Sequence, residues 1–469
     1  MILTSAIQEV IDCICRRGGQ PFIVGGAVRD WLLGKMQGKD VVPKDIDIEV
    51  FGLSNGELRT SIGIFGEVKM VGAAFGVFKL SLGEVDVDIS LPRRESKVGK
   101  GHKEFDVVPD AMMRPLDAAR RRDYTMNALM WDPVSQSLLD FFDGEESLRR
   151  RVLRHVDEET FVDDPLRVLR GMQFCGRFGM QGDFETMRLC HSIFHTFGEL
   201  SLERVWEEWH KWGMQSVDPR AGLQFLVGSG WIFHFPELQA LIGCEQDPEW
   251  HPEGDVLTHS GFAVEHAMRI ANREALDEHD RLVLVFASLC HDMGKPTTSR
   301  VNEEGKIISP GHADAGAPLA ELFLTRIGMV RMASSIAADI TPLVREHMCY
   351  TSLRDPTDAA LRRLALRLAP TTIEQLGHLT EADVSGRPPH APRQPLAHIV
   401  ERAREINVHT SPMKPLLLGR HVLETFPGLK PGPEIGQILR AAKEAQIEGA
   451  FSDVQSGIAW LQKNISVNV

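Results

Sequence analysis

The sequence predicts an α+β protein in which an N-terminal part with a β-sheet is followed by two helical parts. Residues 1–145 alternate helical segments with short runs rich in β-branched and aromatic residues, such as "KDIDIEVFGL", and glycine marks the turns. From residue 146 the helical period dominates, as in "SLERVWEEWHKWGMQ". The stretch "CEQDPEWHPEGD" (244–255) is typical of a linker, so we predict parts at 1–145, 146–245 and 246–469.

The composition is that of an ordinary globular protein. Of 469 residues, 43% are hydrophobic and 25% charged, and the length fits several domains. No run approaches the roughly 18 apolar residues of a membrane helix, so no membrane partner is expected. Glu9 and Asp12 interrupt the N-terminal stretch, which argues against a signal peptide. The seven cysteines form no CxxC pair, which favours reduced thiols and a cytoplasmic location.

Charge is unevenly distributed along the chain. The net charge of −13 argues, taken alone, against a nucleic-acid partner. Residues 93–122, however, hold nine Lys or Arg against five Asp or Glu, and "RRRVLRH" follows at 149–155. A local basic surface of this kind can bind a phosphate backbone. The alternative is a set of solvated charged faces.

Two aspartates alternate with isoleucines in a run that reads as a strand. Asp45 and Asp47 are two residues apart, so both side chains project from one face. Like charges this close repel each other unless a cation lies between them. Mg²⁺ suits the pair, since it commonly takes one or two carboxylates together with substrate phosphates.

A glycine turn precedes this strand. In "VGGAVRD", Gly25 and Gly26 allow close approach of the backbone, and the N–H groups of the helix that follows can face a phosphate. Arg29 adds a positive charge. A second acidic pair, Asp86 and Asp88, has the same strand spacing. We select Asp88 as a third carboxylate; the alternative for this pair is a solvated strand edge.

"VGGAVRDWLLG" followed by DxD resembles the GGxVRDxLLG and DxD motifs of the polymerase-β superfamily. The stretch is most similar to class II tRNA nucleotidyltransferases and their bacterial poly(A) polymerase relatives. The resemblance implies a polymerase-β-type nucleotidyltransferase head. In it, Asp45 and Asp47 would hold Mg²⁺ over a triphosphate and help to activate an RNA 3′-hydroxyl, with Asp88 as the further catalytic residue.

Two more motifs extend the resemblance. "RRDYTMNAL" resembles the family's RRDFTINAL block, which implies that Arg121, Arg122 and Asp123 contact ribose and phosphates. An arginine cluster is also the physical complement of a triphosphate.

"DDPLRVLRGMQF" resembles the family's EDxxR helix, with Asp163 in place of Glu. The matching nucleotide-binding residues are Asp164, Arg167 and Arg170. Gln173 stands where the family has a further arginine, which leaves one phosphate contact without its cation.

Asp164 and Arg167 have the chemistry to select a base. Three residues apart on a helix, they can present one edge together. The carboxylate accepts from an exocyclic amine and the guanidinium donates to a ring nitrogen, a pattern that cytosine and adenine fit and that guanine and uracil oppose. A mispaired buried polar group costs about 1–3 kcal/mol. The alternative is a helix N-cap at Asp164 with Pro165 at the first helical position.

Histidines concentrate in the C-terminal half. "LTHSG", "LCHDMGKP", "PGHADAG", "REHMC" and "LTEADVSGR" supply His259, His291, Asp292, His312, His347 and Asp383. Imidazole with carboxylate suits Mn²⁺, Fe²⁺, Co²⁺, Ni²⁺ or Zn²⁺. The motifs resemble HD-superfamily metal-dependent phosphohydrolases. We predict a metal on His259, His291, Asp292 and Asp383, with His312 and His347 binding a substrate phosphate or completing a second metal position.

Head and HD domain together resemble bacterial multifunctional CCA proteins. The resemblance implies addition of C and A to tRNA 3′ ends from CTP and ATP without a template, with HD phosphatase and 2′,3′-cyclic phosphodiesterase activity. Residues 94–117 have the size of a family loop that helps to switch from C to A, which favours A addition. The alternatives are an A-adding enzyme or poly(A) polymerase, and a signalling HD hydrolase with a nucleotide-binding head. Both a monomer and a homodimer stay open.

Overall fold

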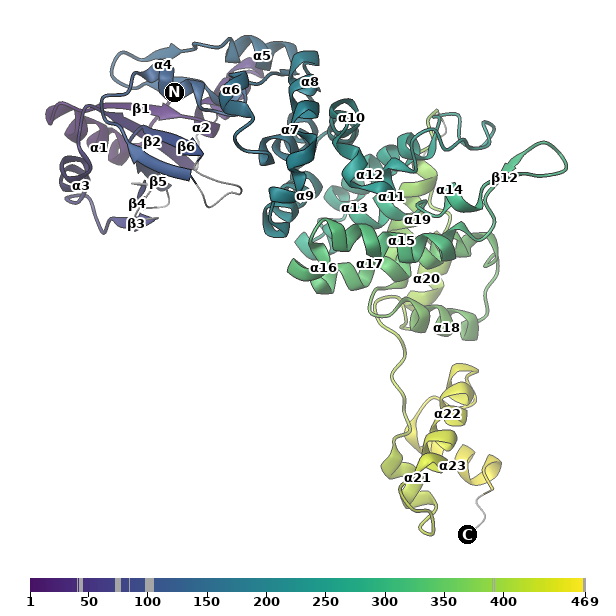
Figure 1. Ribbon diagram of the computed structural model, residues 1–469. Coiled ribbons are helices and arrows are strands. Elements are labelled where there is room, and N and C mark those ends of the chain that lie inside the picture. Colours follow the sequence, from purple (N-terminus) through teal and green to yellow (C-terminus); the bar gives the residue numbers. More distant parts are fainter. Residues whose placement is uncertain are drawn as a thin grey trace. The chain divides into compact units, whose positions relative to one another are not determined.

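The computed structural model describes residues 1–39, 41, 45–71, 77–83, 85–97, 105–389, 391 and 393–466. The chain forms two compact units, Met1–His234 and Phe235–Val469. The first holds a β-sheet followed by helices and the second is almost entirely helical (Figure 1), which confirms the predicted α+β class. The predicted boundaries at residues 145 and 245 stay predictions. Within the predicted 94–117 loop, residues 98–104 lie outside the described part.

The first unit is built on a sheet of seven short strands. Their order across the sheet is β3 (Lys69–Val71), β4 (Val77–Leu82), β5 (Val85–Ser90), β2 (Asp45–Phe51), β1 (Gln20–Val24), β8 (Met130–Asp132) and β9 (Ser137–Leu139). β2 and β5 run parallel, and the other neighbours run antiparallel. Along β2, Ile46 and Ile48 are buried while Asp45 and Asp47 are exposed, so the alternation presents both aspartates on one face as predicted.

Helices pack against this sheet, and further helices follow it in the chain. The N-terminal stretch that Glu9 and Asp12 interrupt forms α1 (Ser5–Arg16), an amphipathic helix that buries Ile7, Val10 and Ile14. The glycine turn opens α2 (Gly26–Met36), as expected. The remaining elements near the sheet are α3 (Asn55–Ile62), β6 (Arg93–Lys97), β7 (Phe105–Pro109), α4 (Pro115–Arg120), α5 (Gly144–Arg150), β10 (Val152–Leu153) and α6 (Glu158–Phe161).

The helical part of this unit is organised around α7 (Leu166–Phe178). Its neighbours are β11 (Gln181–Gly182), α9 (Leu202–Gln215) and α10 (Pro219–Ser229), and α8 (Phe184–Ser192) packs against α10. The Tyr124 hydroxyl donates a 2.7 Å hydrogen bond to the Arg167 carbonyl and thereby ties the sheet part to α7. A Cβ on Gly171 would lie 2.3 Å from that hydroxyl and 2.6 Å from Phe225. The close approach of α7 to its neighbours therefore requires glycine at this position.

The second unit is a helical bundle followed by a small helical group. The bundle contains α11 (Pro236–Gln239), α12 (Val256–Arg273), α13 (Glu278–Cys290), α14 (Lys295–Thr298), α15 (His312–Arg326), α16 (Met329–Met332), α17 (Ser334–Glu346), α18 (Asp358–Leu368), α19 (Ile373–Ser385) and α20 (Ala397–Glu405). A hairpin of β12 (Arg300–Val301) and β13 (Ile307–Ile308) lies between α14 and α15 in the chain.

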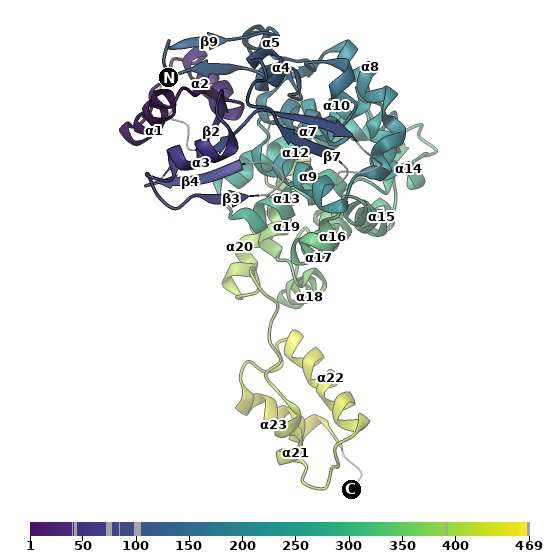
Figure 2. The same cartoon turned by 60° about the vertical axis from the view of Figure 1, so that its left-hand side comes forward.

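The last three helices share a core of their own. α21 (Gly419–Thr425), α22 (Pro433–Ile447) and α23 (Val454–Asn464) lie together (Figure 2). They enclose Val422, Ile438, Ala442 and Leu461. Across the described residues, no helix combines the length and the apolar character needed to cross a bilayer.

Replacing Gly171 by alanine should destabilise the first unit. The added methyl group cannot be accommodated without moving Tyr124 or Phe225, and overpacking of this kind costs about 1–3 kcal/mol. Gly198→Ala is the control, because a Cβ there meets nothing within 4 Å. Urea unfolding should show a lower midpoint for Gly171→Ala alone. Equal midpoints for the two variants would contradict the packing described for α7.

Candidate functional site

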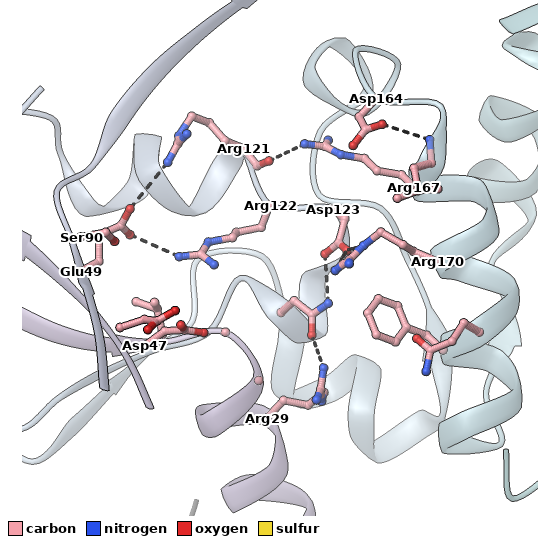
Figure 3. A pocket seen from close by; sticks show the side chains of 18 of the residues that line it. Arg29, Asp47, Glu49, Ser90, Arg121, Arg122, Asp123, Asp164, Arg167 and Arg170 are labelled. Atoms are coloured by element: carbon pink, nitrogen blue, oxygen red, sulfur yellow. Dashed lines mark hydrogen bonds and ion pairs between the residues drawn. The ribbon is translucent and has the colours of Figure 1, made fainter. Parts of the chain in front are cut away.

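A cavity of about 630 Å³ in the first unit is lined by residues from all the segments that the sequence singled out for nucleotide chemistry (Figure 3). Of the predicted site residues, those lining it are Gly25, Gly26, Arg29, Asp47, Asp88, Arg121, Arg122, Asp123, Asp164, Arg167 and Arg170. Asp45 lies two residues before Asp47 on the same face of β2. These residues come from β2, β5, α2, the turn after α4, and α7 with the turn before it.

Parallel pairing of β2 with β5 places acidic residues side by side. Asp45 lies opposite Asp86, and Asp47 lies opposite Asp88. Asp88 lines the cavity, whereas Asp86 accepts a 2.8 Å hydrogen bond from the Ser81 hydroxyl. This arrangement favours Asp88 over Asp86 as the third carboxylate.

The acidic cluster carries excess negative charge. Although Asp47 is accessible to solvent, its partial desolvation within the cavity raises its pKa, and the charges of Asp88 and Asp45 raise the pKa further, while Arg122 and Lys79 lower it. A divalent cation would relieve this repulsion, and carboxylate oxygens are the ligands that Mg²⁺ prefers. The residues present therefore fit a Mg²⁺ ion.

The glycine turn brings backbone close to these acids. Gly25 has a φ of +67°, which favours glycine, and a Cβ there would lie 3.5 Å from Arg122 Nη1 and 3.7 Å from Asp47 Oδ2. A side chain at Gly25 would therefore take up space between the carboxylate and the arginine.

Glu49 is a residue that the sequence analysis missed. It is the third acid on the same face of β2, it is 3% exposed, and it lies 3.6 Å from Arg121 Nη2 and 3.4 Å from Arg122 Nη2 (Figure 3). The sequence places Glu49 two residues after Asp47 and therefore on the same strand face, but the sequence analysis gave it no role of its own. Glu49 holds the two arginines beside the strand carboxylates.

Asp123 is more enclosed than its predicted contact with ribose suggested. It is 8% exposed, its Oδ2 accepts from Arg170 Nε at 2.8 Å, and its Oδ1 accepts from Asn127 Nδ2 at 3.0 Å. Asn127 Oδ1 in turn accepts from Arg29 Nη1 at 2.7 Å. Burial opposes the charge of Asp123, but Arg170 and Asn127 outweigh it and lower the pKa of Asp123. The chain of contacts connects α2 to α7.

Asp164 and Arg167 both line the cavity but are held by different partners. Asp164 Oδ2 accepts from Arg204 Nη2 at 2.8 Å, and its Oδ1 accepts from the Leu166 amide at 3.1 Å. The bond from the Leu166 amide resembles the helix-capping contact that was the alternative role for Asp164. Asp164 makes this contact and also lines the cavity. Arg167 donates to the carbonyls of Thr160 at 2.9 Å and Arg121 at 2.7 Å.

Arg204 and Gln173 complete this wall. Arg204, on α9, was missed because the pattern "SLERVWEEW" shows only an amphipathic helix with Ser201 at its N-cap. Gln173 is 1% exposed and lines the cavity, and its Nε2 has no hydrogen-bond partner among the described residues.

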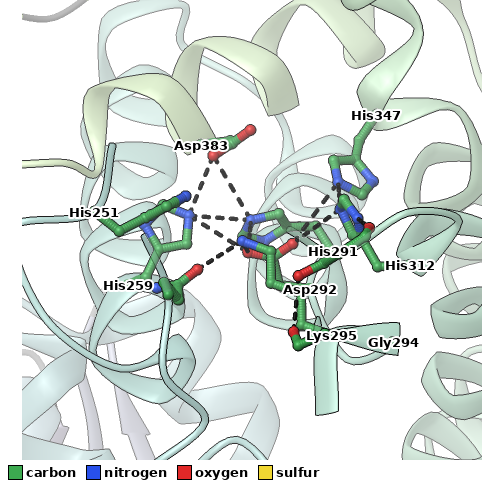
Figure 4. Close-up of polar contacts among 12 residues, drawn as sticks. His251, His259, His291, Asp292, Gly294, Lys295, His312, His347 and Asp383 are labelled. Carbon is green, nitrogen blue, oxygen red and sulfur yellow. Dashed lines mark hydrogen bonds and ion pairs between the residues drawn. The ribbon is translucent and has the colours of Figure 1, made fainter. Parts of the chain in front are cut away.

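The second unit gathers its six predicted residues into one buried cluster, which we call the HD centre (Figure 4). It comprises His259 on α12, His291 and Asp292 directly after α13, His312 on α15, His347 directly after α17, and Asp383 on α19. Each is between 0% and 6% exposed. Helices far apart in sequence therefore deliver imidazoles and carboxylates to one point.

Asp292 divides the HD centre into two groups. Its Oδ2 lies 3.2 Å from His291 Nε2 and 3.7 Å from His259 Nε2, and Asp383 Oδ1 lies 3.1 Å from the same His259 atom. Asp292 Oδ1 faces the other group and lies 3.2 Å from His312 Nε2 and 3.9 Å from His347 Nε2. Each group offers three or more donors of the type that transition metals bind.

The tautomers suit metal binding. The Nδ1 atoms of His291, His312 and His347 donate to the carbonyls of Ser288, Ser309 and Val344 at 2.8, 2.7 and 2.6 Å. The Nε2 atoms that face the cluster are then free to act as ligands. Burial lowers the pKa of His347 to about 3, with further lowering by His291 and His312, so this ring is neutral at pH 7.

The predicted linker at 244–255 packs against the HD centre. Its backbone is irregular, as expected, but the side chain of Glu253 is fully buried, and its Oε1 accepts from His259 Nδ1 at 2.7 Å and from His251 Nδ1 at 2.9 Å. Burial opposes the charge of Glu253, yet these two hydrogen bonds lower its pKa to about 2. Composition alone did not reveal these contacts, because a polar stretch with prolines is not distinguishable in sequence from one whose few side chains are buried.

Two cations also border the HD centre. Lys295 Nζ lies 2.7 Å from Asp292 Oδ2, and Arg387 Nη2 donates to Asp383 Oδ1. Both residues stand in motifs that the sequence analysis quoted, but neither was given a role.

Comparison with known proteins covers both units. Residues 21–154 match the poly A polymerase head domain family, and residues 256–381 match the HD domain family. The structure of the Thermotoga maritima CCA-adding enzyme complexed with tRNA has the same fold, with a TM-score of 0.58 over 98% of this chain and 96% of that chain at 17% identity.

Two relatives match the chain along much of its length. A multifunctional CCA protein of Hahella chejuensis is 35% identical over 327 residues, 68% of this chain and 70% of that protein. Another, from Xanthomonas campestris pv. campestris (strain B100), is 31% identical over 453 residues, 92% of this chain and 98% of that protein. With such identity along nearly the whole of a relative, and with both sites assembled as described, the chain belongs to the family of multifunctional CCA proteins.

Proposed function

We propose that this protein adds C and A nucleotides to tRNA 3′ ends without a nucleic-acid template, using CTP and ATP, and that its HD centre hydrolyses phosphoester bonds. The observation that carries the first part is the 630 Å³ cavity, in which strand carboxylates, an arginine cluster and the Asp164–Arg167 pair meet. Solved CCA-adding enzymes of the same fold have been captured with CTP, ATP and tRNA, which supports these substrates.

The head would use Asp45 and Asp47, with Asp88 beside them, to hold Mg²⁺. The ion supplies charge neutralisation at the triphosphate when bound. Arg121 and Arg122, held by Glu49, would bind the phosphates as charge-assisted donors. The backbone at Gly25 and Gly26 would let the triphosphate approach the start of α2.

Base choice would rest on Asp164 and Arg167. A carboxylate and a guanidinium facing one cavity accept from the amine and donate to the ring nitrogen of cytosine or adenine. Arg204 would orient the carboxylate, because it binds Asp164 Oδ2 from α9. With guanine or uracil, donor would face donor and acceptor would face acceptor, so no template is required for the exclusion.

The HD centre would hold a transition metal on His259, His291, Asp292 and Asp383, and Asp292 Oδ1 with His312 and His347 offers a second position. Such a metal supplies Lewis-acid polarisation of a phosphoryl oxygen and activates water when bound. Lys295 and Arg387, which contact Asp292 and Asp383, would bind phosphate oxygens next to it. Phosphomonoesters and 2′,3′-cyclic phosphates are the proposed substrates. With seven free cysteines, a cytoplasmic location is proposed.

Asp47→Asn should abolish nucleotide addition. The loss should reach at least about a hundredfold, since a metal at a phosphoryl group contributes several kcal/mol and each 1.4 kcal/mol is tenfold in rate. Because the folded pKa of Asp47 is raised, its ionised form disfavours folding above that pKa, and Asp47→Asn should keep or raise the melting temperature at pH 7. The assay supplies tRNA lacking its 3′ end with each labelled NTP and sequences the products.

Asp86→Asn is the matched control, since Asp86 shares the strand geometry but bonds to Ser81 instead. It should keep near-normal addition. Near-normal addition by Asp47→Asn would refute the proposed head function. Wild-type products ending in a single A or in a run of A would instead identify an A-adding enzyme or a poly(A) polymerase.

Alanine at Asp164 or Arg167 should relax base selection. Preference for CTP and ATP over UTP and GTP should fall by about 10- to 100-fold, the equivalent of a mispaired polar group at 1–3 kcal/mol. Arg204→Ala should change selectivity in the same direction but less. Arg188→Ala, an exposed arginine on α8 paired with Glu185, is the control. Variants that lose only thermal stability and keep full selectivity would limit Asp164 to a capping role.

Asp292→Asn should remove hydrolysis of 2′,3′-cyclic nucleotides and leave nucleotide addition largely unchanged. The HD centre draws all its side chains from the second unit, and the cavity draws all of its own from the first. Hydrolysis is measured with Mn²⁺, Co²⁺ or Ni²⁺ added singly, and addition is measured in Mg²⁺. Full hydrolysis by the variant would show that Asp292 is dispensable, and a parallel loss of both activities would contradict separate sites.

A further inference from the structure

His259 is held differently from the other histidines of the HD centre. The other three donate Nδ1–H to uncharged backbone carbonyls. His259 donates to the carboxylate of Glu253, with a distance of 2.7 Å between Nδ1 and Oε1. A charged acceptor makes a stronger hydrogen bond than a neutral one and increases the electron-donating strength of the opposite ring nitrogen. That opposite atom is the His259 Nε2 that faces Asp383 and Asp292.

Glu253 is enclosed directly behind one imidazole of the HD centre. Its side chain is 0% exposed, and its Oε2 has no hydrogen-bond partner among the described residues. Its Oε1 accepts from both His251 and His259. A carboxylate in this place would interact favourably with a cation bound on the far side of the His259 imidazole.

The local fold fixes where Glu253 lies. The Asp255 side chain caps α12 by accepting from the Thr258 backbone amide at 2.9 Å, and the Gln246 side-chain Nε2 donates to the Gly254 carbonyl at 3.2 Å. Gln246 Oε1 also accepts from Lys295 Nζ at 2.6 Å. Residues 244–255 are therefore attached to the HD centre at two places, through Lys295 and through His259. Figure 4 shows His251, the second donor to Glu253, beside His259.

We propose that Glu253 is a positioning residue of the HD centre, which holds His259 in the tautomer and orientation that bind a transition metal and thereby sets the affinity for that metal. The inference rests on the proposed metal-dependent function of the HD centre. Glu253 lies outside the histidine and aspartate motifs from which the centre was predicted. It acts through His259 and does not contact the reacting atoms.

The test compares Ni²⁺ and Co²⁺ binding by the full-length wild type, Glu253→Gln and Glu253→Ala, using isothermal titration calorimetry. Loss of an outer carboxylate of this kind weakens metal binding by about 10- to 100-fold. We expect this loss in Glu253→Ala and a smaller one in Glu253→Gln, which retains an oxygen acceptor. The visible absorption of the Co²⁺-loaded protein should also change, because the orientation of one ligand changes. Glu249→Gln is the control, an exposed residue of the same segment that pairs with Lys306 at 3.0 Å.

A folding control separates this role from a structural one. Both variants should melt below the wild-type temperature without metal, Glu253→Ala more than Glu253→Gln, because the Nδ1–H groups of His251 and His259 lose their carboxylate acceptor. The calorimetry is therefore run at a temperature at which circular dichroism shows that all the proteins are folded. Unchanged affinity in a folded Glu253→Ala protein would overturn the inference, as would an unchanged absorption spectrum of its Co²⁺-loaded form. A wild type that binds neither metal would overturn the proposed function of the HD centre itself, an outcome distinct from failure of the variants.

Discussion

Repulsion between carboxylates is the constraint on which the first unit depends. β2 and β5 run parallel in a register that brings Asp47 opposite Asp88 and Asp45 opposite Asp86. Strand geometry makes this crowding unavoidable, since alternate side chains share a face and paired strands lie about 4.8 Å apart. Positively charged side chains nearby reduce this repulsion. Arg122 acts on Asp47, and Glu49 fixes the arginines at the distance from which they can do so.

The HD centre handles the same problem in a different way. Its carboxylates are buried, and each is surrounded by imidazoles and one permanent cation, Lys295 for Asp292 and Arg387 for Asp383. These cations and the neighbouring imidazoles outweigh burial and lower the pKa values of Asp292 and Asp383 well below the usual range. Both remain ionised in the interior and are ready to bind a metal. The carboxylates of the first unit therefore lie at the wall of an open cavity, and those of the HD centre lie inside a helical bundle.

Local patterns in the sequence were sufficient for the main features. The period-2 alternation at Asp45–Ile48 located the strand face, and the HD dyad with its flanking histidines identified a cluster that the structure brings together. The residues that support these groups were not predictable in this way. Arg204 reaches Asp164 across 40 residues, and Glu253 lies in a stretch whose composition indicates a loop. Their roles depend on which element packs beside which, information that periodicity and spacing do not contain.

Asp164 combines two tasks, because one oxygen bonds to the backbone at the start of α7 while the side chain lines the nucleotide cavity. In the proposed role of Asp164 in base choice, a substitution made to change nucleotide preference would therefore also alter how the helix begins. Substitutions that suit guanine or uracil would have to supply a new hydrogen-bond acceptor for the Leu166 amide. Few side chains meet both requirements, so the proposed choice of C and A would be coupled to the folding of the helix.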